Sequence, residues 1–359
     1  MALASPVAAA LATGAVGLVV FPLLGRSPLA ALHAFFVAPL ATRNGLAELV
    51  LKASPLMTIA TGLAVGFRAS VWNIGAEGQL VVGAICGGGL ALYFEGAETR
   101  WVLVLMLMAG ALGGMAWAAI PALLRTWCHA SEILVTLMLA YVAPLLLSYL
   151  VHGPWRDPQG YNFPQSKLFD DAFLFPILVP GTRLNASVLL ALAVVGLGWL
   201  VMGRSFLGYQ MRVTGLAEAA ARYAGFPTAR AVWVGLLAGG AAAGLAGVGE
   251  VAGPIGQLTP SVSPGYGFAA IIVAFVGRLS APGIVLASLL MSWLYLGGES
   301  AQIRLALPSA ITGLFQGLLL SFLLAGDVLV SYRVRLGRVR AAHRPAAEAR
   351  PAGVCQVDA

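Results

Sequence analysis

The sequence predicts an all-α, polytopic membrane protein, and two observations carry that prediction: a composition very poor in charge and a series of long apolar runs. Of the 359 residues, 60% are hydrophobic and only 10% are charged, whereas soluble domains have about 25% charged residues. A hydrocarbon core about 30 Å thick needs roughly 20 apolar residues per helix, and on that rule we expect about ten transmembrane helices, including short broken ones.

Most of the expected helices are long enough to cross the membrane unaided. They lie near 5–25, 101–123, 132–151, 187–203, 231–252, 282–298 and 309–331. The first resembles a secretory signal, but no basic residue precedes its apolar stretch, so we interpret it as a transmembrane helix. The topology of 26–54 is left open, and Leu29–Ala53 is compatible with an interfacial helix.

Three apolar pieces are shorter: Pro55–Phe67, Leu80–Tyr93 and Gly265–Val276. The first and third run only about a dozen residues, too few to span the core, before an arginine and a break that contains Gly or Pro. Short or interrupted segments at matching positions in two halves of a transporter often form a discontinuous helix pair at the substrate path. We therefore expect such a pair near 55–80 and 261–283.

Arginines set the expected orientation. An even number of spans places both termini on one side, and basic residues mark the cytoplasmic side of a membrane protein. That side receives Arg125, Arg204, Arg212, Arg222, Arg230 and the arginines between 333 and 350. We expect cytoplasmic termini, a cytoplasmic loop at 204–230, an external loop at 152–186 and a disordered, Arg-rich cytoplasmic tail at 332–359. Arg26, Arg43 and Lys52 fall on the external side and weaken this asymmetry.

Polar side chains at membrane depth mark the candidate translocation path. Asn73, Glu77 and Gln79 stand between apolar runs, and such groups cost several kcal/mol unless they face protein or water. Gly75 and Gly78 weaken the helix there and let other backbone approach. The alternative is that 68–79 forms an ordinary cytoplasmic loop with a helix cap.

Further candidates for the path come from the second half of the chain. They are Glu250, Tyr266 and Phe268. Glu250 ends a glycine-rich helix, so it either lines the path or simply reaches water, and Glu299 reads as a solvated residue of an outer loop. The histidines and cysteines show no ligand spacing, so neither a metal site nor a catalytic group is expected. The net charge of +7 indicates orientation rather than a nucleic-acid partner.

The cytoplasmic loop contains a short helix too charged to span. Leu216–Phe226 is rich in helix formers and is bounded by Gly215 and Gly225. Connections between spans need only a few residues, so this helix either docks a soluble partner or is a plain surface helix.

These motifs resemble a known family. The string Asn73–Gln79, the loop Gly215–Gly225, and Pro264–Gly277 followed by Pro282-Gly283 are similar to the permease subunits of ATP-binding cassette (ABC) importers. Within that group the chain resembles the branched-chain amino acid, ribose and nucleoside permeases, and most of all the nucleoside type, over about Val50–Arg333. Relatives often have Asn-Pro at Ala217-Glu218, which leaves the start of the short helix open, and Phe at Trp72, a change that would tune the path.

The resemblance implies a permease domain at 1–331 in a bacterial inner (cytoplasmic) membrane, paired with ATPase subunits, a second homologous permease and an external substrate-binding lipoprotein. It makes Leu216–Gly225 the coupling helix that contacts the ATPase. The residues implied at that contact are Gly215, Glu218, Ala220, Ala221, Arg222 and Gly225.

ATP must be hydrolysed by another polypeptide. The chain has no Gly-Lys dipeptide, so it cannot form a P-loop, and we expect it to bind no cofactor. The expected mechanism is alternating access driven by the ATPases. The expected substrates are nucleosides or purine bases, with simple sugars second, and both rest on the resemblance. A proton-coupled secondary transporter that uses Glu77 or Glu250 is the alternative from another class, whereas a membrane enzyme has no catalytic grouping to support it.

Overall fold

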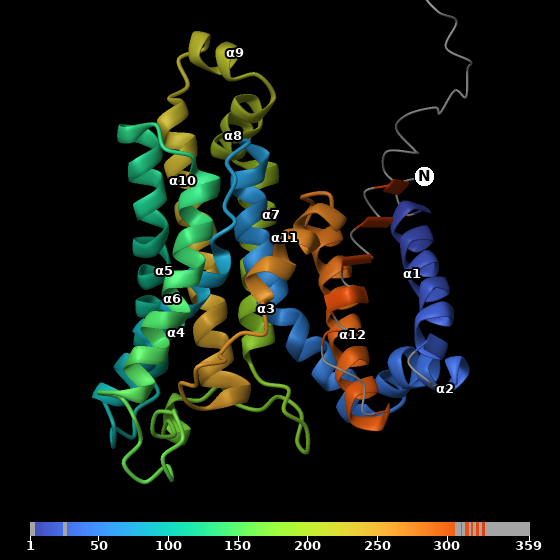
Figure 1. The fold of residues 1–359 in the computed structure, drawn as a ribbon. Helices are drawn as coiled ribbons and strands as arrows, with labels where there is room; N and C mark the ends of the chain where they lie inside the picture. The colour runs from blue at the N-terminus through green and yellow to red at the C-terminus, as the bar shows by residue number, and fades with distance from the viewer. Residues whose placement is uncertain are drawn as a thin grey trace, which may run out of the picture.

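The computed structural model describes residues 4–23 and 27–305, together with scattered positions between 310 and 326. Helices make up most of that part of the chain (Figure 1). They are α1 (Ala4–Leu23), α2 (Pro28–Leu32), α3 (Arg43–Arg68), α4 (Ala76–Tyr93), α5 (Trp101–Cys128), α6 (Glu132–His152), α7 (Ser187–Arg204), α8 (Phe206–Leu216), α9 (Glu218–Tyr223), α10 (Thr228–Glu250), α11 (Tyr266–Val276) and α12 (Ala281–Leu305).

Shorter helical turns continue some of these elements. They cover His33–Val37, Ala38–Leu40, Asp171–Phe173 and Val251–Ile255. Among the described residues, β pairing is limited to an isolated bridge between Ile177 and Asn185.

Seven of the described helices are long and apolar enough to cross a membrane: α3, α4, α5, α6, α7, α12, and α10 together with the turn that follows it. Shorter apolar helices cover Leu11–Val20, Leu29–Leu40 and Tyr266–Val276. The prediction of an all-α polytopic protein is confirmed at this level. The tail at 332–359 and most of the span expected at 309–331 lie outside the described residues.

Glycines allow α4, α5 and α10 to pack with their backbones in contact. A Cβ on Gly244 of α10 would collide with the backbone carbonyl of Gly110 in α5, and one on Gly83 of α4 would collide with the backbone of Gly244. Small residues drive helix association in membranes because burying apolar surface gains little there. α3, α4 and α10 therefore form the buried centre of the molecule, and α5 packs on it with one face.

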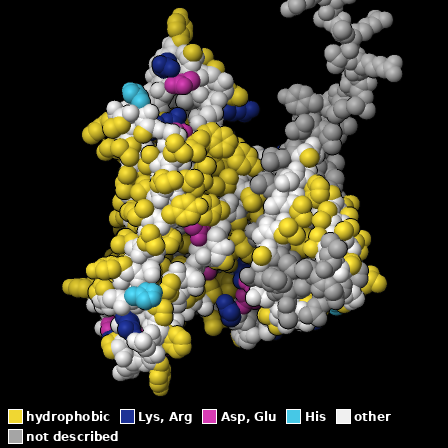
Figure 2. All heavy atoms as spheres, in the orientation of Figure 1, with side chains coloured by type: hydrophobic (Ala, Val, Ile, Leu, Met, Phe, Trp, Pro, Cys, Tyr) yellow, Lys and Arg dark blue, Asp and Glu magenta, His cyan; other side chains and the backbone are white. Residues whose placement is uncertain are grey.

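The outer helices expose apolar side chains instead. Along α6 the exposed residues are Leu134, Met138, Tyr141, Leu145 and Tyr149. Because they recur every three or four residues, they lie on one face of the helix. Figure 2 shows hydrophobic side chains over much of the middle of the molecule, as a lipid-facing surface requires.

The first of the two expected short helices is absent, and the second is present. Pro55–Phe67 belongs to α3, which runs unbroken from Arg43 to Arg68, so the expected short helix there is wrong. The break follows α3 instead, in the non-helical residues 69–75, which we call the link. α11 confirms the short helix expected at Gly265–Val276. An interfacial helix over Leu29–Ala53 is also wrong beyond residue 42, because α3 begins at Arg43.

Two ends of the molecule are distinct. The helices α8 and α9 lie at one end, and the non-helical segment 153–186 lies at the other (Figure 1). Arg183 of that segment pairs with Glu48 of α3, their Nε and Oε1 atoms 3.3 Å apart. Lys52 pairs with Glu299 at 2.8 Å, and Glu299 lies within α12, so its expected place in an outer loop is wrong. Of the basic residues on the expected external side, Lys52 is thus neutralised by an ion pair within the protein.

Candidate functional site

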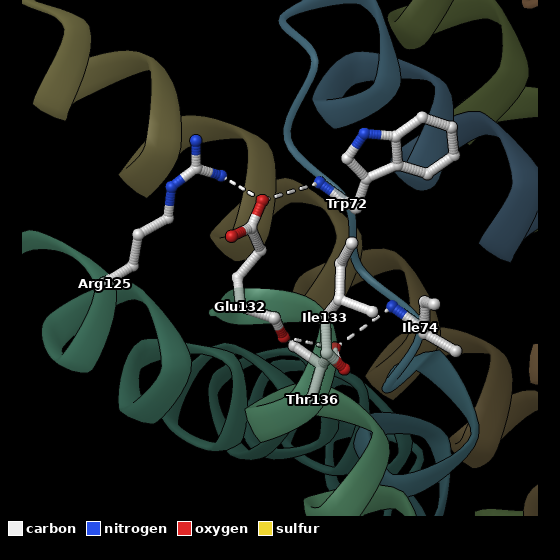
Figure 3. A network of polar contacts seen from close by, with 6 residues as sticks. All are labelled: Trp72, Ile74, Arg125, Glu132, Ile133 and Thr136. Carbon is white, nitrogen blue, oxygen red and sulfur yellow. Dashed lines mark hydrogen bonds and ion pairs between the residues drawn. The ribbon is translucent and has the colours of Figure 1, made fainter. Parts of the chain in front are cut away.

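The link alternates buried and exposed residues, and side chains hold part of its backbone. Asn73 and Val71 are almost fully buried, whereas Ser70 and Trp72 are exposed, so the non-helical loop of the alternative is present but is only partly open to solvent. Figure 3 shows that the N–H of Trp72 donates to Glu132 (3.4 Å) and the N–H of Ile74 donates to the Thr136 hydroxyl (3.2 Å). Both acceptors come from the start of α6, where Glu132 also pairs with Arg125 of α5. Side chains thus satisfy donors that a helix would otherwise satisfy.

Asn73 and Gln79 form a closed amide pair. Asn73 Nδ2 donates to Gln79 Oε1 at 2.8 Å, and Gln79 Nε2 donates back to Asn73 Oδ1 at 3.1 Å. The same Asn73 oxygen accepts the N–H of Gly75. The two amides satisfy each other in a buried position, so they fix the link against the first turn of α4.

Glu77 caps the short helix α11. Its Oε2 accepts the backbone N–H of Gly267 at 2.6 Å, and the side chain of Ser263 and the backbone of Gly265 also hydrogen-bond to the carboxyl group. The first N–H groups of a helix have no partner within the helix and carry a partial positive charge. A carboxylate in this position satisfies them and holds α11 against α4.

The glycines of the polar string permit this arrangement. A Cβ on Gly75 would lie 2.7 Å from the Thr136 carbonyl oxygen, and one on Gly78 would lie 2.8 Å from Ala140 Cα. A side chain on Gly267 would collide with the backbone of Glu77. The expectation that glycine lets other backbone approach is confirmed for Gly75 and Gly78.

Of the remaining path candidates, Tyr266 and Glu250 are buried and Phe268 is partly exposed. Tyr266 is buried at the start of α11 and meets the ring of Tyr295 edge to face, with centroids 5.5 Å apart. Glu250 is buried at the end of α10, within electrostatic range of Lys52 and Arg183, which contradicts the alternative of a carboxylate that simply reaches water. Phe268 is 36% exposed. The structure therefore brings Glu77 and Tyr266 together at the N-terminal end of α11, whereas Asn73 and Gln79 pair with each other between the link and α4.

Sequence reasoning missed three residues that hold this region. Arg68 donates through Nη1 to the Met202 carbonyl (3.2 Å) and through Nη2 to the Leu279 carbonyl (2.7 Å). Glu132 and Thr136 hold the link from α6. The sequence shows Arg68 as a charged residue at the end of an apolar run. It gives no indication of the partners of Arg68, which lie more than a hundred residues away.

The expected coupling residues form a compact element at the arginine-rich end. Gly215 lies near the end of α8, and α9 follows with Glu218 and Arg222 paired at 3.2 Å. Ala221 is buried, whereas Ala220 is exposed. Gly225, at φ +78°, ends α9: its N–H bonds to the Arg222 carbonyl and the next N–H bonds to the Ala221 carbonyl. This is a Schellman motif, which explains the glycine.

A polar cavity separates α9 from the link. It has a volume of about 490 Å³ and is lined by residues of the link, α5, α8, α9 and α10, among them Ser70, Arg125, Gly215 and Arg222. The element exposed at this end therefore lies beside the buried region, with space between them.

Comparison with known proteins agrees with this architecture. The chain is 37% identical over 344 residues to the glucose ABC transporter permease protein TsgB13 of Haloferax volcanii, covering 93% of this chain and 90% of the relative. It is 29% identical to the guanosine ABC transporter permease protein NupP of Bacillus subtilis, over 80% of this chain and 82% of the relative. It is 26% identical to the nucleoside ABC transporter permease protein NupB of Lactococcus lactis subsp. cremoris, over 78% and 79%. No solved structure matches the chain.

The family model described as "Branched-chain amino acid transport system / permease component" matches residues 45–324, which include α3 to α12 and most of the described chain. That range contains the link, the amide pair, the Glu77 cap and the α8–α9 element. The chain therefore belongs to the branched-chain amino acid transport system permease family, as the sequence resemblance implied.

Proposed function

We propose that this chain is one of two homologous permease subunits of an importer in which separate ATPase subunits drive transport and an external lipoprotein delivers the substrate. The observation that carries the proposal is α9, a short, exposed helix at the end of the molecule opposite the 153–186 segment (Figure 1). A transporter driven by an ion gradient has no need of such an element. The chain is a transport subunit and, as a member of a permease family, has neither a catalytic site nor a cofactor of its own.

Transport by this complex follows alternating access. Closure of the ATPases around ATP moves α9 and the neighbouring α8, and the helix bundles rock around the path. ATP shifts the equilibrium toward the outward-open state only if the complex binds it more tightly in that state. The exposed residues Glu218, Ala220, Arg222 and Gly225 make the ATPase contact, whereas the buried Ala221 and the closely packed Gly215 support this element from within.

The transported solute is small, polar and rich in hydroxyl groups. A simple sugar comes first, because the relative with 37% identity over nearly the whole chain is named a glucose permease. Nucleosides come second, supported by the guanosine and nucleoside permeases at 29% and 26% identity. This order reverses the expectation that rested on the family resemblance, in which nucleosides or purine bases came first and simple sugars second.

The chain functions as a multi-pass protein of the cytoplasmic membrane of a prokaryote, with both termini inside. The relatives compared here come from an archaeon and from bacteria, so the location is the cytoplasmic membrane in either case.

Uptake by cells that lack this chain tests the proposal. Cells without it should lose accumulation of labelled glucose or, on the second candidate, of labelled guanosine, and the restored gene should return it. A protonophore should leave this uptake intact while ATP is maintained. Uptake that is unchanged by the deletion for both solutes would contradict the substrate class, and uptake abolished by the protonophore at constant ATP would support a proton-coupled carrier.

A further inference from the structure

We propose that the link transmits movements of the α8–α9 element to α11, and that α11 pivots about its Glu77-capped N-terminus while Trp72 moves its C-terminal end. This inference rests on the proposed function, because it assumes that an ATPase moves α8 and α9. It assigns a role to Trp72 that is distinct from solute binding: a positioning residue for transport.

The link touches the coupling element directly. The hydroxyl of Ser70 donates to the carbonyl oxygen of Gly215, near the end of α8, at 3.1 Å. Gly215 packs so closely that a Cβ there would collide with the carbonyl of Arg68. Arg68 in turn donates to the Met202 carbonyl, just before α8 begins. A displacement of α8 would therefore act directly on residues 68–70, which contact it.

The same stretch holds the C-terminal end of α11. The indole ring of Trp72 stacks on Phe275, with centroids 5.7 Å apart and planes inclined by 21°. Phe275 also stacks on Phe67, the residue before Arg68, at 5.1 Å. Arg68 Nη2 donates to the carbonyl of Leu279, in the turn that joins α11 to α12. Residues 67–72 thus contact the C-terminal end of α11 through the rings of Phe67 and Trp72. They contact the following turn through the hydrogen bond from Arg68.

The N-terminal end of α11 is fixed by a different set of contacts. Glu77 accepts the N–H of Gly267, and Gly267 lies against the backbone of α4. The amide pair of Asn73 and Gln79 fixes the link to α4, and the Thr136 contact to Ile74 fixes it to α6. The N-terminal end of α11 is therefore fixed to α4, whereas its C-terminal end contacts residues that also contact α8. A movement of α8 would rotate α11 about its N-terminal end.

Space and backbone geometry allow the movement. The link is not helical, and the N–H groups of Trp72 and Ile74 are bound by side chains of α6 rather than by a helix ladder (Figure 3). Ser70 has a positive φ of 55°, an uncommon conformation for a residue other than glycine. The cavity of about 490 Å³ borders Ser70 and Gly215, so residues 69–71 have room to shift.

Substitutions of Trp72 test the inference in proteoliposomes that contain the whole complex purified from its native membrane. Trp72→Leu should lower the solute transported per ATP hydrolysed by about tenfold, within the range typical of coupling between sites, while ATPase activity is retained. Trp72→Phe keeps a ring against Phe275 and should restore most of the ratio. Trp199→Leu is the matched control, because Trp199 is a half-exposed indole of α7 whose one ring contact is with Arg204 in the part of the chain described.

The outcomes separate this inference from the proposed function. If the wild-type complex shows no ATP-dependent uptake, the proposed function fails. If the wild type transports and Trp72→Leu has the same ratio as Trp199→Leu, or Trp72→Phe is as uncoupled as Trp72→Leu, the role of the link is wrong and the proposed function stands.

Hydrogen exchange on the wild-type complex gives a second test that needs no variant. Addition of ATP with vanadate should change amide exchange at 69–72 and 275–280 and leave the amides of 267–270 protected. Unchanged exchange at 275–280, or a loss of protection at 267–270, would overturn the pivot.

Discussion

Glu77 shows how one polar residue in an apolar chain acquires a structural role. Its carboxylate accepts backbone N–H groups at the start of α11, where negative charge is favoured by the helix dipole. In this arrangement Glu77 holds a short helix in place rather than standing free in an open path. The sequence identified the residue but not the helix end that it caps.

Substitutions of Glu77 test whether its contacts with α11 are needed for transport or only for the stability of the protein. Glu77→Ala removes the acceptor, so we expect uptake to be abolished while the protein remains in the membrane; Glu77→Gln keeps one acceptor oxygen and should retain part of the activity. Quantitative blotting of membranes alongside uptake measures both. Uptake at the wild-type level in Glu77→Ala would remove this residue from the site.

Gln79→Leu tests the amide pair. It leaves the buried amide of Asn73 without its partner, which costs about 1–3 kcal/mol for each unsatisfied group. We expect a lower melting temperature in detergent. The control is Gln210→Leu, because Gln210 lies in α8 and its side chain forms no hydrogen bond recorded among the described residues. Equal melting temperatures for the two variants would contradict a stabilising role for the pair.

At the scale of helices, glycine determines the packing of α4, α5 and α10. Gly244→Val places side-chain atoms where the backbone of Gly110 lies, so we expect little folded protein by fluorescence-detected size-exclusion chromatography. Gly196→Val in α7 is the matched control, because a Cβ at Gly196 meets nothing within 4 Å. A monodisperse Gly244→Val protein in normal amount would show that these helices pack less closely than described.

The α9 element yields a separate prediction. Gly225 adopts a positive φ that a β-branched residue rarely adopts, and Ala220 is exposed where the ATPase contact is proposed. Gly225→Val or Ala220→Trp should uncouple ATP hydrolysis from transport while the complex stays assembled. Normal substrate-stimulated ATPase activity together with normal transport would defeat the coupling role.

The sequence predicts some elements well because their patterns are local. α5, α6 and α7 are long, almost uncharged runs, and α11 and the Gly225 helix end are marked by adjacent glycines. It fails for α3, because Arg43, Glu48 and Lys52 interrupt the apolar pattern. Glu48 and Lys52 pair with Arg183 and Glu299, far away in the chain, and such pairing cannot be predicted from one segment. The partners of Arg68 and Glu77 are hidden for the same reason.

At the scale of the whole molecule, we propose that separate ATPase subunits supply the energy for the conformational change of this helix bundle. Arginines gather near α8 and α9 and the segment 153–186 lies at the opposite end (Figure 1), while Arg68 of α3 and Glu77 of α4 hold the two ends of the short helix α11. A bundle of membrane-spanning helices is what membership in a permease family requires. The account further requires partners that supply energy and substrate.

Purification of a tagged copy from its native membrane in mild detergent tests that claim most directly, with the co-purifying proteins identified and ATPase activity assayed. The account predicts recovery of an ATPase, a second permease and a binding lipoprotein, with ATP hydrolysis stimulated by the loaded lipoprotein. A chain that is recovered alone and supports uptake that is sensitive to a protonophore and independent of ATP would contradict it.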